Sequence, residues 1–282
     1  MTEINLMLQK YAAPFWDKFF LVVSGISNEY VYVAMVLLIY YFVDKYKGVK
    51  IGLIVSSTLM LNFLFKNSLK VPRPYVNNKD IVCKDIAQGY GYSFPSGHSQ
   101  LNVTFFTGIH KLFGKKRFIP LSAAFVLLTA FSRVYLGVHS VFDVAAGLMI
   151  GLLWSLIACK YIDVVLKEKK YLLIIFSLVG IIDVILFKNT DSIKMLCLYF
   201  GLISGFLIED KYVGYVNADK LSVKMLECIF CFAGILLIQL VFKCLPSGLK
   251  YLKYFSVGLW SSYAAPYFLT KIRRSAQTRL KP

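Results

Sequence analysis

Apolar blocks separated by short polar gaps run along most of the chain. Nine of these blocks predict membrane-spanning helices, because they are long, continuous and poor in charge. Several are shorter than the roughly 20 residues that cross a bilayer core, so their helices should extend into the flanking segments. The predicted spans are Glu29–Val43, Val49–Phe65, Ser99–Phe113, Phe118–Tyr135, Val141–Ile162, Tyr171–Phe187, Ile193–Ile208, Met225–Phe242 and Tyr254–Leu269.

The first 27 residues differ from these blocks, because aromatic and charged positions are mixed. Four aromatic residues lie between Phe15 and Phe20, together with Asp17 and Lys18. This pattern is typical of an amphipathic helix in the membrane interface. The segment has no basic region followed by an apolar core and a small-residue cleavage site. We therefore expect no cleaved signal, and the first span itself should target the chain.

The composition indicates an all-α, polytopic membrane protein. Residues of the AVILMFWYC set make up 58% of the 282 positions, charged residues make up 17%, and the mean hydropathy is +0.64. Globular domains are nearer to about 45–50% apolar and about 25% charged. Disordered, collagen-like and disulfide-scaffold proteins are excluded. Cys228 and Cys231 are spaced as CxxC but lie in an apolar run, so we expect them to pack as small hydrophobic residues.

The net charge of +17 has two sources. In a soluble protein it would suggest a nucleic-acid partner, but no nucleic-acid-binding motif is present and we expect no such partner. If the C-terminus is cytoplasmic, 19 of the 32 basic residues lie on the inner face, as the positive-inside rule favours. These 19 lie in the segments 44–50, 110–117, 160–170, 209–224 and 271–282. Lys66, Arg73 and Arg133 lie on the opposite face and need another explanation.

One gap between spans is far longer than the others and runs from about Lys66 to His98. Loops of this length are usually functional or disordered. The next two spans form a helical hairpin, so the start of the third and the end of the fourth should share one membrane face. This topology brings His98 and His139 to the same surface. His110 falls at the opposite face and is expected to be a solvated interfacial residue.

The residue types expected at this surface suit a tetrahedral oxyanion. Lys66, Arg73 and Arg133 are cationic donors, and the planar fork of arginine matches phosphate oxygens. Ser96 can cap the helix that follows it, and Gly97 permits close backbone approach. The backbone N–H groups at the start of that helix would then form an anion site.

His139 and Asp143 are spaced i, i+4 and share a helix face. The carboxylate can hold one ring N–H and leave the other nitrogen nucleophilic. Taken singly, each of these residues would also fit a solvated residue at a helix end. Their convergence with the cationic residues on one face favours a reactive site.

Three motifs in this region resemble the signature of the type 2 phosphatidic acid phosphatase (PAP2) superfamily. They are Lys66-x6-Arg73-Pro74, Pro95-Ser96-Gly97-His98 and Ser132-Arg133-x5-His139-x3-Asp143. Every signature position is matched, and three motifs in order are highly specific. The resemblance implies a six-helix catalytic core. The expected parts are an interfacial segment at 1–27, a PAP2-type membrane core at 28–165, and additional transmembrane helices with a basic tail at 166–282.

The resemblance also implies a role for each motif residue. His139 would attack phosphorus to form a phosphohistidine, with Asp143 orienting it, and His98 would protonate the leaving group and then activate water. The family works without a metal or another cofactor, and no carboxylate cluster in this sequence demands one. The residues expected to bind the phosphate are Lys66, Arg73, Ser96, Gly97 and Arg133.

The expected function is hydrolysis of a lipid phosphate or diphosphate, of the phosphatidate or polyprenyl type, at the extracytoplasmic face of a bacterial plasma membrane. The partners are then the lipid substrate and the bilayer. The nine-span layout also resembles glucose-6-phosphatase-like and sphingosine-phosphate-phosphatase-like members. A soluble sugar phosphate, lipid phosphotransfer, and a channel, transporter or assembly factor that only binds anions are the alternatives. Asp183, an acid within the sixth span, is either functional or an interfacial cap.

Overall fold

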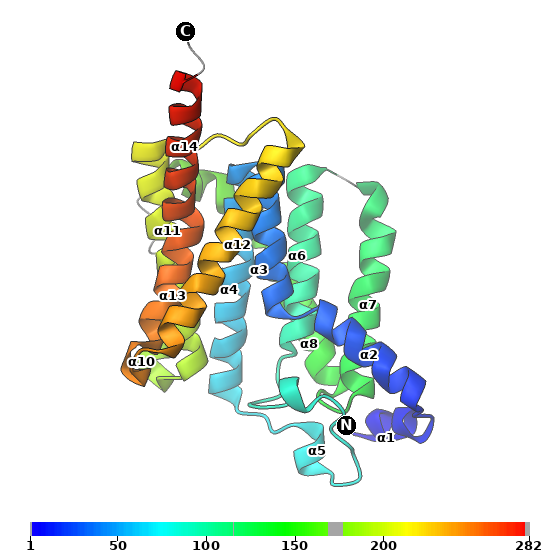
Figure 1. The fold of residues 1–282 in the computed structure, drawn as a ribbon. Coiled ribbons are helices and arrows are strands. Elements are labelled where there is room, and N and C mark those ends of the chain that lie inside the picture. The colour runs from blue at the N-terminus through cyan, green and yellow to red at the C-terminus, as the bar shows by residue number, and fades with distance from the viewer. Residues whose placement is uncertain (1, 115, 169–176, 280–282) are drawn as a thin grey trace. The chain divides into compact units, whose positions relative to one another are not determined.

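The computed structural model describes residues 2–114, 116–168 and 177–279. Within these residues all regular elements are helices, so the expectation of an all-α protein is confirmed. Figure 1 draws the described helices. The chain forms two compact units. Unit 1 comprises Met1–Val33 and Ser57–Asp163, and unit 2 comprises Ala34–Ser56 and Val164–Pro282. Three helices, α3, α4 and α8, contribute residues to both units.

Unit 1 holds the N-terminal helices, the long loop and the predicted hairpin. Its complete elements are α1 (Glu3–Lys10), α2 (Pro14–Ile26), α5 (Pro74–Asn77), the 3-10 helix η2 (Ile86–Gln88), α6 (Gly97–Phe113), the 3-10 helix η3 (Lys116–Phe118) and α7 (Ile119–Tyr135). It shares α3 (Glu29–Leu38), α4 (Lys45–Leu69) and α8 (Val141–Lys167) with unit 2.

Local sequence signals account for the ends of the hairpin helices. Ser96 is the N-cap of α6, and its Oγ accepts from the backbone N–H of Ser99 at 3.5 Å. Gly114 ends α6 with a φ of 65°, a left-handed conformation that glycine adopts without steric cost. A proline in the first turn of α7 costs no hydrogen bond, because the N–H groups there have no partner within the helix. These signals place the start of α6 and the end of α7 at one end of unit 1.

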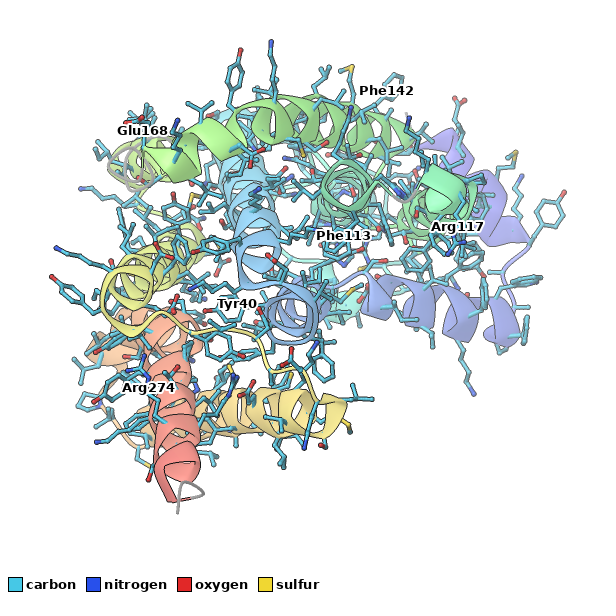
Figure 2. The ribbon with its side chains drawn as sticks, turned by 90° about the horizontal axis from the view of Figure 1, so that it is seen from above. Tyr40, Phe113, Arg117, Phe142, Glu168 and Arg274 are labelled. Atoms are coloured by element: carbon cyan, nitrogen blue, oxygen red, sulfur yellow. The ribbon has the colours of Figure 1, made fainter. Side chains whose placement is uncertain are left out.

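Two glycines let α6 and α8 approach each other backbone to backbone. A Cβ atom on Gly147 would lie 2.5 Å from the carbonyl oxygen of Ser96, and one on Gly151 would lie 2.4 Å from that of Gln100. Such small-xxx-small pairs are common where membrane helices pack closely. The side chain of Phe142, also on α8, points away from α6 and α7 (Figure 2) and is 61% exposed, as suits a lipid-facing position.

Unit 2 contains three π-helical stretches, η1 (Ile39–Val43), η5 (Glu209–Val213) and η7 (Trp260–Ala264). Buried Lys45 and Glu209 form an ion pair in this unit, since Lys45 Nζ contacts both carboxylate oxygens of Glu209 at 3.0 Å. Cys228 and Cys231 are buried free cysteines, and Asp183 is fully buried. The remaining elements are α10 (Leu178–Phe187), α11 (Thr190–Ile208), α12 (Leu221–Lys243), η6 (Ser247–Leu249), α13 (Lys250–Leu259) and α14 (Ala265–Arg279).

The chain is a multi-pass membrane protein. Within the described residues, five helices are long and apolar enough to cross a membrane, or six if α2 and the α3–η1 helix, bent by 47°, form one span. The number nine stays a prediction. The predicted span Ser99–Phe113 corresponds to α6, which has only 17 residues, and Tyr171–Phe187 begins outside the described residues. The five helices are Lys45–Asn77, Lys116–Tyr135, Val141–Lys167, Thr190–Val213 and Leu221–Lys243.

Candidate active site

Several segments of unit 1 meet at one end of the hairpin. They are the end of α4, the loop 70–96, the start of α6, and the turn 136–140 with the start of α8. The backbone N–H of Ser96 donates to the carbonyl of Asp143 at 2.9 Å and joins the start of α6 to that of α8. Helices α1 and α5 lie at this same end (Figure 1). Phe113 and Arg117 mark the opposite end of the hairpin (Figure 2).

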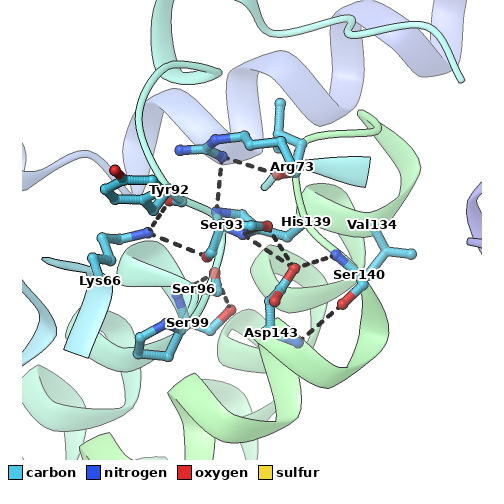
Figure 3. A network of polar contacts seen from close by, with 12 residues as sticks. Lys66, Arg73, Tyr92, Ser93, Ser96, Ser99, Val134, His139, Ser140 and Asp143 are labelled. Atoms are coloured by element: carbon cyan, nitrogen blue, oxygen red, sulfur yellow. Dashed lines mark hydrogen bonds and ion pairs between the residues drawn. The ribbon is translucent and has the colours of Figure 1, made fainter. Parts of the chain in front are cut away.

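His139 and Asp143 are linked through a serine of the long loop (Figure 3). Ser93 Oγ donates to Asp143 Oδ2 at 2.6 Å and lies 3.3 Å from His139 Nδ1. His139 Nδ1 and Asp143 Oδ2 are 3.8 Å apart, which exceeds hydrogen-bonding distance. The backbone N–H of Ser140 also donates to Asp143 Oδ2, at 2.6 Å. The i, i+4 spacing therefore brings the two side chains near each other, and Ser93 completes the connection.

Arg73 lies on the other side of the His139 ring. Its Nη1 is 3.3 Å from His139 Nε2 and donates to the carbonyl of Val138 at 2.9 Å, while its Nη2 and Nε donate to two backbone carbonyls of the long loop. A guanidinium group can only donate. His139 Nε2 must therefore present its lone pair, and the ring proton sits on Nδ1, toward Ser93. In this tautomer Nε2 is the ring nitrogen with an available lone pair.

Arg133 is fully buried and only partly paired. Its Nη1 donates to Asp85 Oδ2 at 2.7 Å and to Ser24 Oγ. Among the described residues, Arg133 Nε and Nη2 and His98 Nε2 are buried side-chain nitrogens without a hydrogen-bond partner. Burying polar groups without partners costs free energy. Three such atoms beside Arg73 and Lys66 point to an anionic ligand that accepts hydrogen bonds.

Lys66 holds the loop that carries Ser93. Its Nζ donates to the backbone carbonyls of Tyr92 and Ser93 at 2.6 and 3.2 Å. Gly97 begins α6 beside Asn62, and a Cβ atom there would lie 3.2 Å from Asn62 Oδ1. The lysine thus has a structural contact in addition to the phosphate contact expected of it, and the glycine leaves room for Asn62.

The N-terminal helix α1 reaches the same loops. Asn5 is fully buried, and its Nδ2 donates to the backbone carbonyls of Val134 and His139 at 2.8 and 2.9 Å. Gln9, one turn further along, pairs with both backbone groups of Val82 in the long loop, at 2.8 and 3.0 Å. Helix α1 therefore holds the backbone of His139 and of the long loop through side-chain hydrogen bonds.

The structure brings the predicted residues to one end of unit 1. His98 lies within electrostatic range of His139, Arg73, Arg133 and Lys66, and Ser96 and Gly97 lie beside Asp143. Sequence reasoning missed Ser93, Asp85 and Asn5. The only available signal was that Ser93 and Asp85 belong to the unusually long loop. Across the described ranges, no group of three or more His, Cys, Asp or Glu residues could hold a metal ion.

Two family profiles match this chain. The profile described as PAP2 superfamily matches residues 47–166, which hold all three motifs. The profile described as PAP2 superfamily phosphatase, transmembrane extension, matches residues 193–277. This chain belongs to the PAP2 superfamily. The PAP2 match begins after α1 and α2, so the contacts of Asn5 and Gln9 come from residues outside it.

Two phosphatases are similar to this protein over about half of its chain. A probable sphingosine-1-phosphate phosphatase from Dictyostelium discoideum is 28% identical over 171 residues, or 56% of this chain and 41% of that protein. Lipid A 4'-phosphatase from Bacteroides thetaiotaomicron is 26% identical over 163 residues, or 53% of this chain and 71% of that protein. The similarity thus spans less than half the length of the first relative.

Two solved structures share the PAP2 fold. The crystal structure of Aquifex aeolicus LpxE matches with a TM-score of 0.50 and 24% identity, over 56% of this chain and 94% of that one. The first transmembrane PAP2 type phosphatidylglycerolphosphate phosphatase from Bacillus subtilis matches with a TM-score of 0.50 and 21% identity, over 57% and 84%. At this identity the likeness concerns the fold.

Proposed function

We propose that this protein is a phosphatase that removes phosphate from a membrane lipid through a phosphohistidine on His139. The observation that carries the proposal is the set of unpartnered buried nitrogens on Arg133 and His98, next to a histidine whose Nε2 presents a lone pair. An oxyanion with four oxygens would satisfy those donors. Its phosphorus could then be attacked by Nε2.

The chemistry proceeds in two displacements. In the first, His139 Nε2 forms a bond to phosphorus while the bond from phosphorus to the leaving oxygen breaks, and His98 gives that oxygen a proton. In the second, His98 takes a proton from water, the resulting hydroxide attacks phosphorus, and the N–P bond breaks to release phosphate. Arg73 and Arg133 offset the negative charge on the equatorial oxygens in both steps.

A lipid phosphate is the substrate class best supported. The site lies at one end of a helical hairpin in a multi-pass membrane protein, where a headgroup can arrive while its chains stay in lipid. Both named relatives are phosphatases of lipid phosphates, as their names state. The distribution of basic residues favours an extracytoplasmic site, in a bacterial plasma membrane.

A substrate panel in detergent with EDTA tests this proposal. It contains phosphatidate, sphingosine 1-phosphate, a polyprenyl diphosphate, a phosphorylated lipid A and glucose 6-phosphate, with inorganic phosphate as the readout. Release from at least one lipid and not from glucose 6-phosphate is expected. Turnover of the sugar phosphate alone would overturn the lipid assignment, and phosphate affinity without any turnover would make the protein an anion binder. Adding a lipid alcohol as acceptor detects phosphotransfer.

The pH dependence of the reaction should follow His139. Burial lowers the pKa of His139 well below its usual value of 6.5, and the charges of Arg73 and Lys66 act in the same direction, whereas Asp143 opposes the shift. Since a protonated imidazole cannot attack phosphorus, activity is lost as pH falls through this lowered pKa. The acid limb of kcat/KM is therefore expected below pH 6.5. An Asp143→Asn variant should move that limb to lower pH, and a shift to higher pH would contradict the assignment.

The contacts of α1 predict that Asn5 supports activity. Asn5→Asp keeps the shape of the side chain but removes the donor to the carbonyl of His139, at about 1–3 kcal/mol, whereas the carbonyl of Val134 keeps the backbone N–H of Gly137. We expect a lower unfolding temperature and a kcat about tenfold lower. Gln9→Ala is the matched control, since it removes hydrogen bonds of α1 without touching the carbonyl of His139. Equal effects of the two variants on kcat would contradict this prediction.

A further inference from the structure

We propose that Ser93 is a positioning residue of the reaction, which connects His139 to Asp143 through its hydroxyl. The inference rests on the proposed function of His139. In this arrangement His139 Nδ1–H donates to Ser93 Oγ, and Ser93 Oγ–H donates to Asp143 Oδ2. The serine thereby fixes the ring orientation and the tautomer that leave Nε2 free to attack phosphorus.

The direction of both hydrogen bonds follows from the donors available. A serine hydroxyl has one proton, and the 2.6 Å separation from Asp143 Oδ2 identifies the carboxylate as its acceptor. Ser93 Oγ must then accept from its other neighbour, His139 Nδ1, at 3.3 Å. Arg73, which can only donate toward Nε2, independently requires the ring proton on Nδ1. The two sides of the ring therefore give the same tautomer.

The backbone of Ser93 is fixed from two directions. Its N–H donates to the carbonyl of Val71 at 2.8 Å, and its carbonyl accepts from Lys66 Nζ at 3.2 Å. The residue is also fully buried. A hydroxyl held in this way loses little conformational entropy when it bridges the two side chains, as a preorganised site requires.

The carboxylate cannot replace the bridge from its present position. Asp143 Oδ2 is 3.8 Å from His139 Nδ1 and already accepts from the backbone N–H of Ser140 at 2.6 Å. When Nε2 bonds to phosphorus, positive charge develops on the imidazole, and Ser93 transmits the stabilising effect of the carboxylate to it. No proton needs to leave Nδ1 for this effect, because the hydrogen bonds shorten as the charge grows.

Three variants test the proposal in the phosphate-release assay. Ser93→Ala removes the hydroxyl and is expected to lower kcat about 10- to 100-fold with little change in KM, since a hydrogen bond to a charged group is lost. Ser93→Thr keeps the hydroxyl and should recover most of the activity. Ser155→Ala is the matched control, because Ser155 is also fully buried in unit 1 but donates only to Leu152 O in its own helix. Its kcat should be unchanged.

A double-mutant cycle separates positioning from a merely structural contribution. If Ser93 acts through Asp143, removing it from an Asp143→Ala protein should lower kcat less than twofold. An undiminished effect in that background, or a Ser93→Ala variant as active as the parent, overturns the proposal. If Ser93→Ala does not fold, Ser93→Cys takes its place, because cysteine keeps the shape of the side chain but is a weak donor. Its kcat is expected to be lower than that of Ser93→Thr, and an equal kcat would contradict the proposal. Failure of the proposed function itself gives a different result, which is full activity of a His139→Ala protein.

Discussion

Replacing His139 by alanine is expected to lower the rate of phosphate release by about 10⁴-fold or more. The variant lacks the nitrogen proposed to attack phosphorus but keeps Arg73 and Arg133, the proposed phosphate ligands. Substrate affinity should therefore change much less than kcat. The measurement is brief incubation with a lipid that carries ³²P in its phosphate group. It should label the parent protein as an acid-labile phosphoenzyme and leave the variant unlabelled.

His110→Ala is the matched control for this experiment. His110 lies at the opposite end of the hairpin, where its Nε2 contacts Ser122 Oγ at 3.0 Å, so its loss should leave kcat within about twofold. A second variant, His98→Ala, should still form the phosphoenzyme from a substrate with a good leaving group but hydrolyse it slowly. Phosphate release by His139→Ala at the parent rate would remove the basis of the proposed mechanism.

Replacing Arg133 by methionine is expected to reduce both activity and stability. Arg133 is fully buried, its Nη1 pairs with Asp85, and its Nε and Nη2 have no hydrogen-bond partner among the described residues. Removing it leaves the carboxylate of Asp85 unpaired in a buried site, which costs about 3–5 kcal/mol of folding free energy. Losing the donors to the phosphate should lower kcat/KM about 10²- to 10³-fold. Thermal unfolding in detergent and steady-state kinetics measure the two effects.

A double variant separates the loss of stability from the loss of phosphate binding. Arg133→Met combined with Asp85→Asn removes the unpaired charge, so it should recover part of the stability and none of the activity. Arg117→Met is the control, because Arg117 is an exposed arginine at the other end of the hairpin. The assignment of Arg133 to phosphate binding fails if the double variant recovers the parent kcat/KM.

Much of this site could be predicted from the sequence, because its motifs adjoin helix ends. The hairpin of α6 and α7 follows from apolar periodicity, and it places His98 and Arg133 at one end of the unit. His139 and Asp143 are then fixed by local spacing. The number of spans could not be predicted as safely. Helix α6 has 17 residues, fewer than the roughly 20 that cross a bilayer core, and carries polar positions such as Asn102 on its buried side.

Ser93, Asp85 and Asn5 could not be predicted as site residues, because their partners lie far away in the chain. Ser93 and Asp85 contact side chains 46 and 48 residues away, and Asn5 contacts a backbone carbonyl 134 residues away. No periodicity or spacing connects such positions. A single serine, aspartate or asparagine carries no sign of its partner until the helices are packed. The interfacial placement of residues 1–27 stays a prediction, while the contacts of Asn5 add a link to the site.

The clamp of α1 on the turn before α8 has a consequence for biosynthesis. Asn5 is made 134 positions before His139, whose carbonyl it holds. Helix α1 therefore stays without this partner until α7 and the turn that follows it have been made. Contacts of such high sequence separation form late in folding. The newly made protein should thus be inserted in the membrane before it becomes active, and α1 docks when the site is completed.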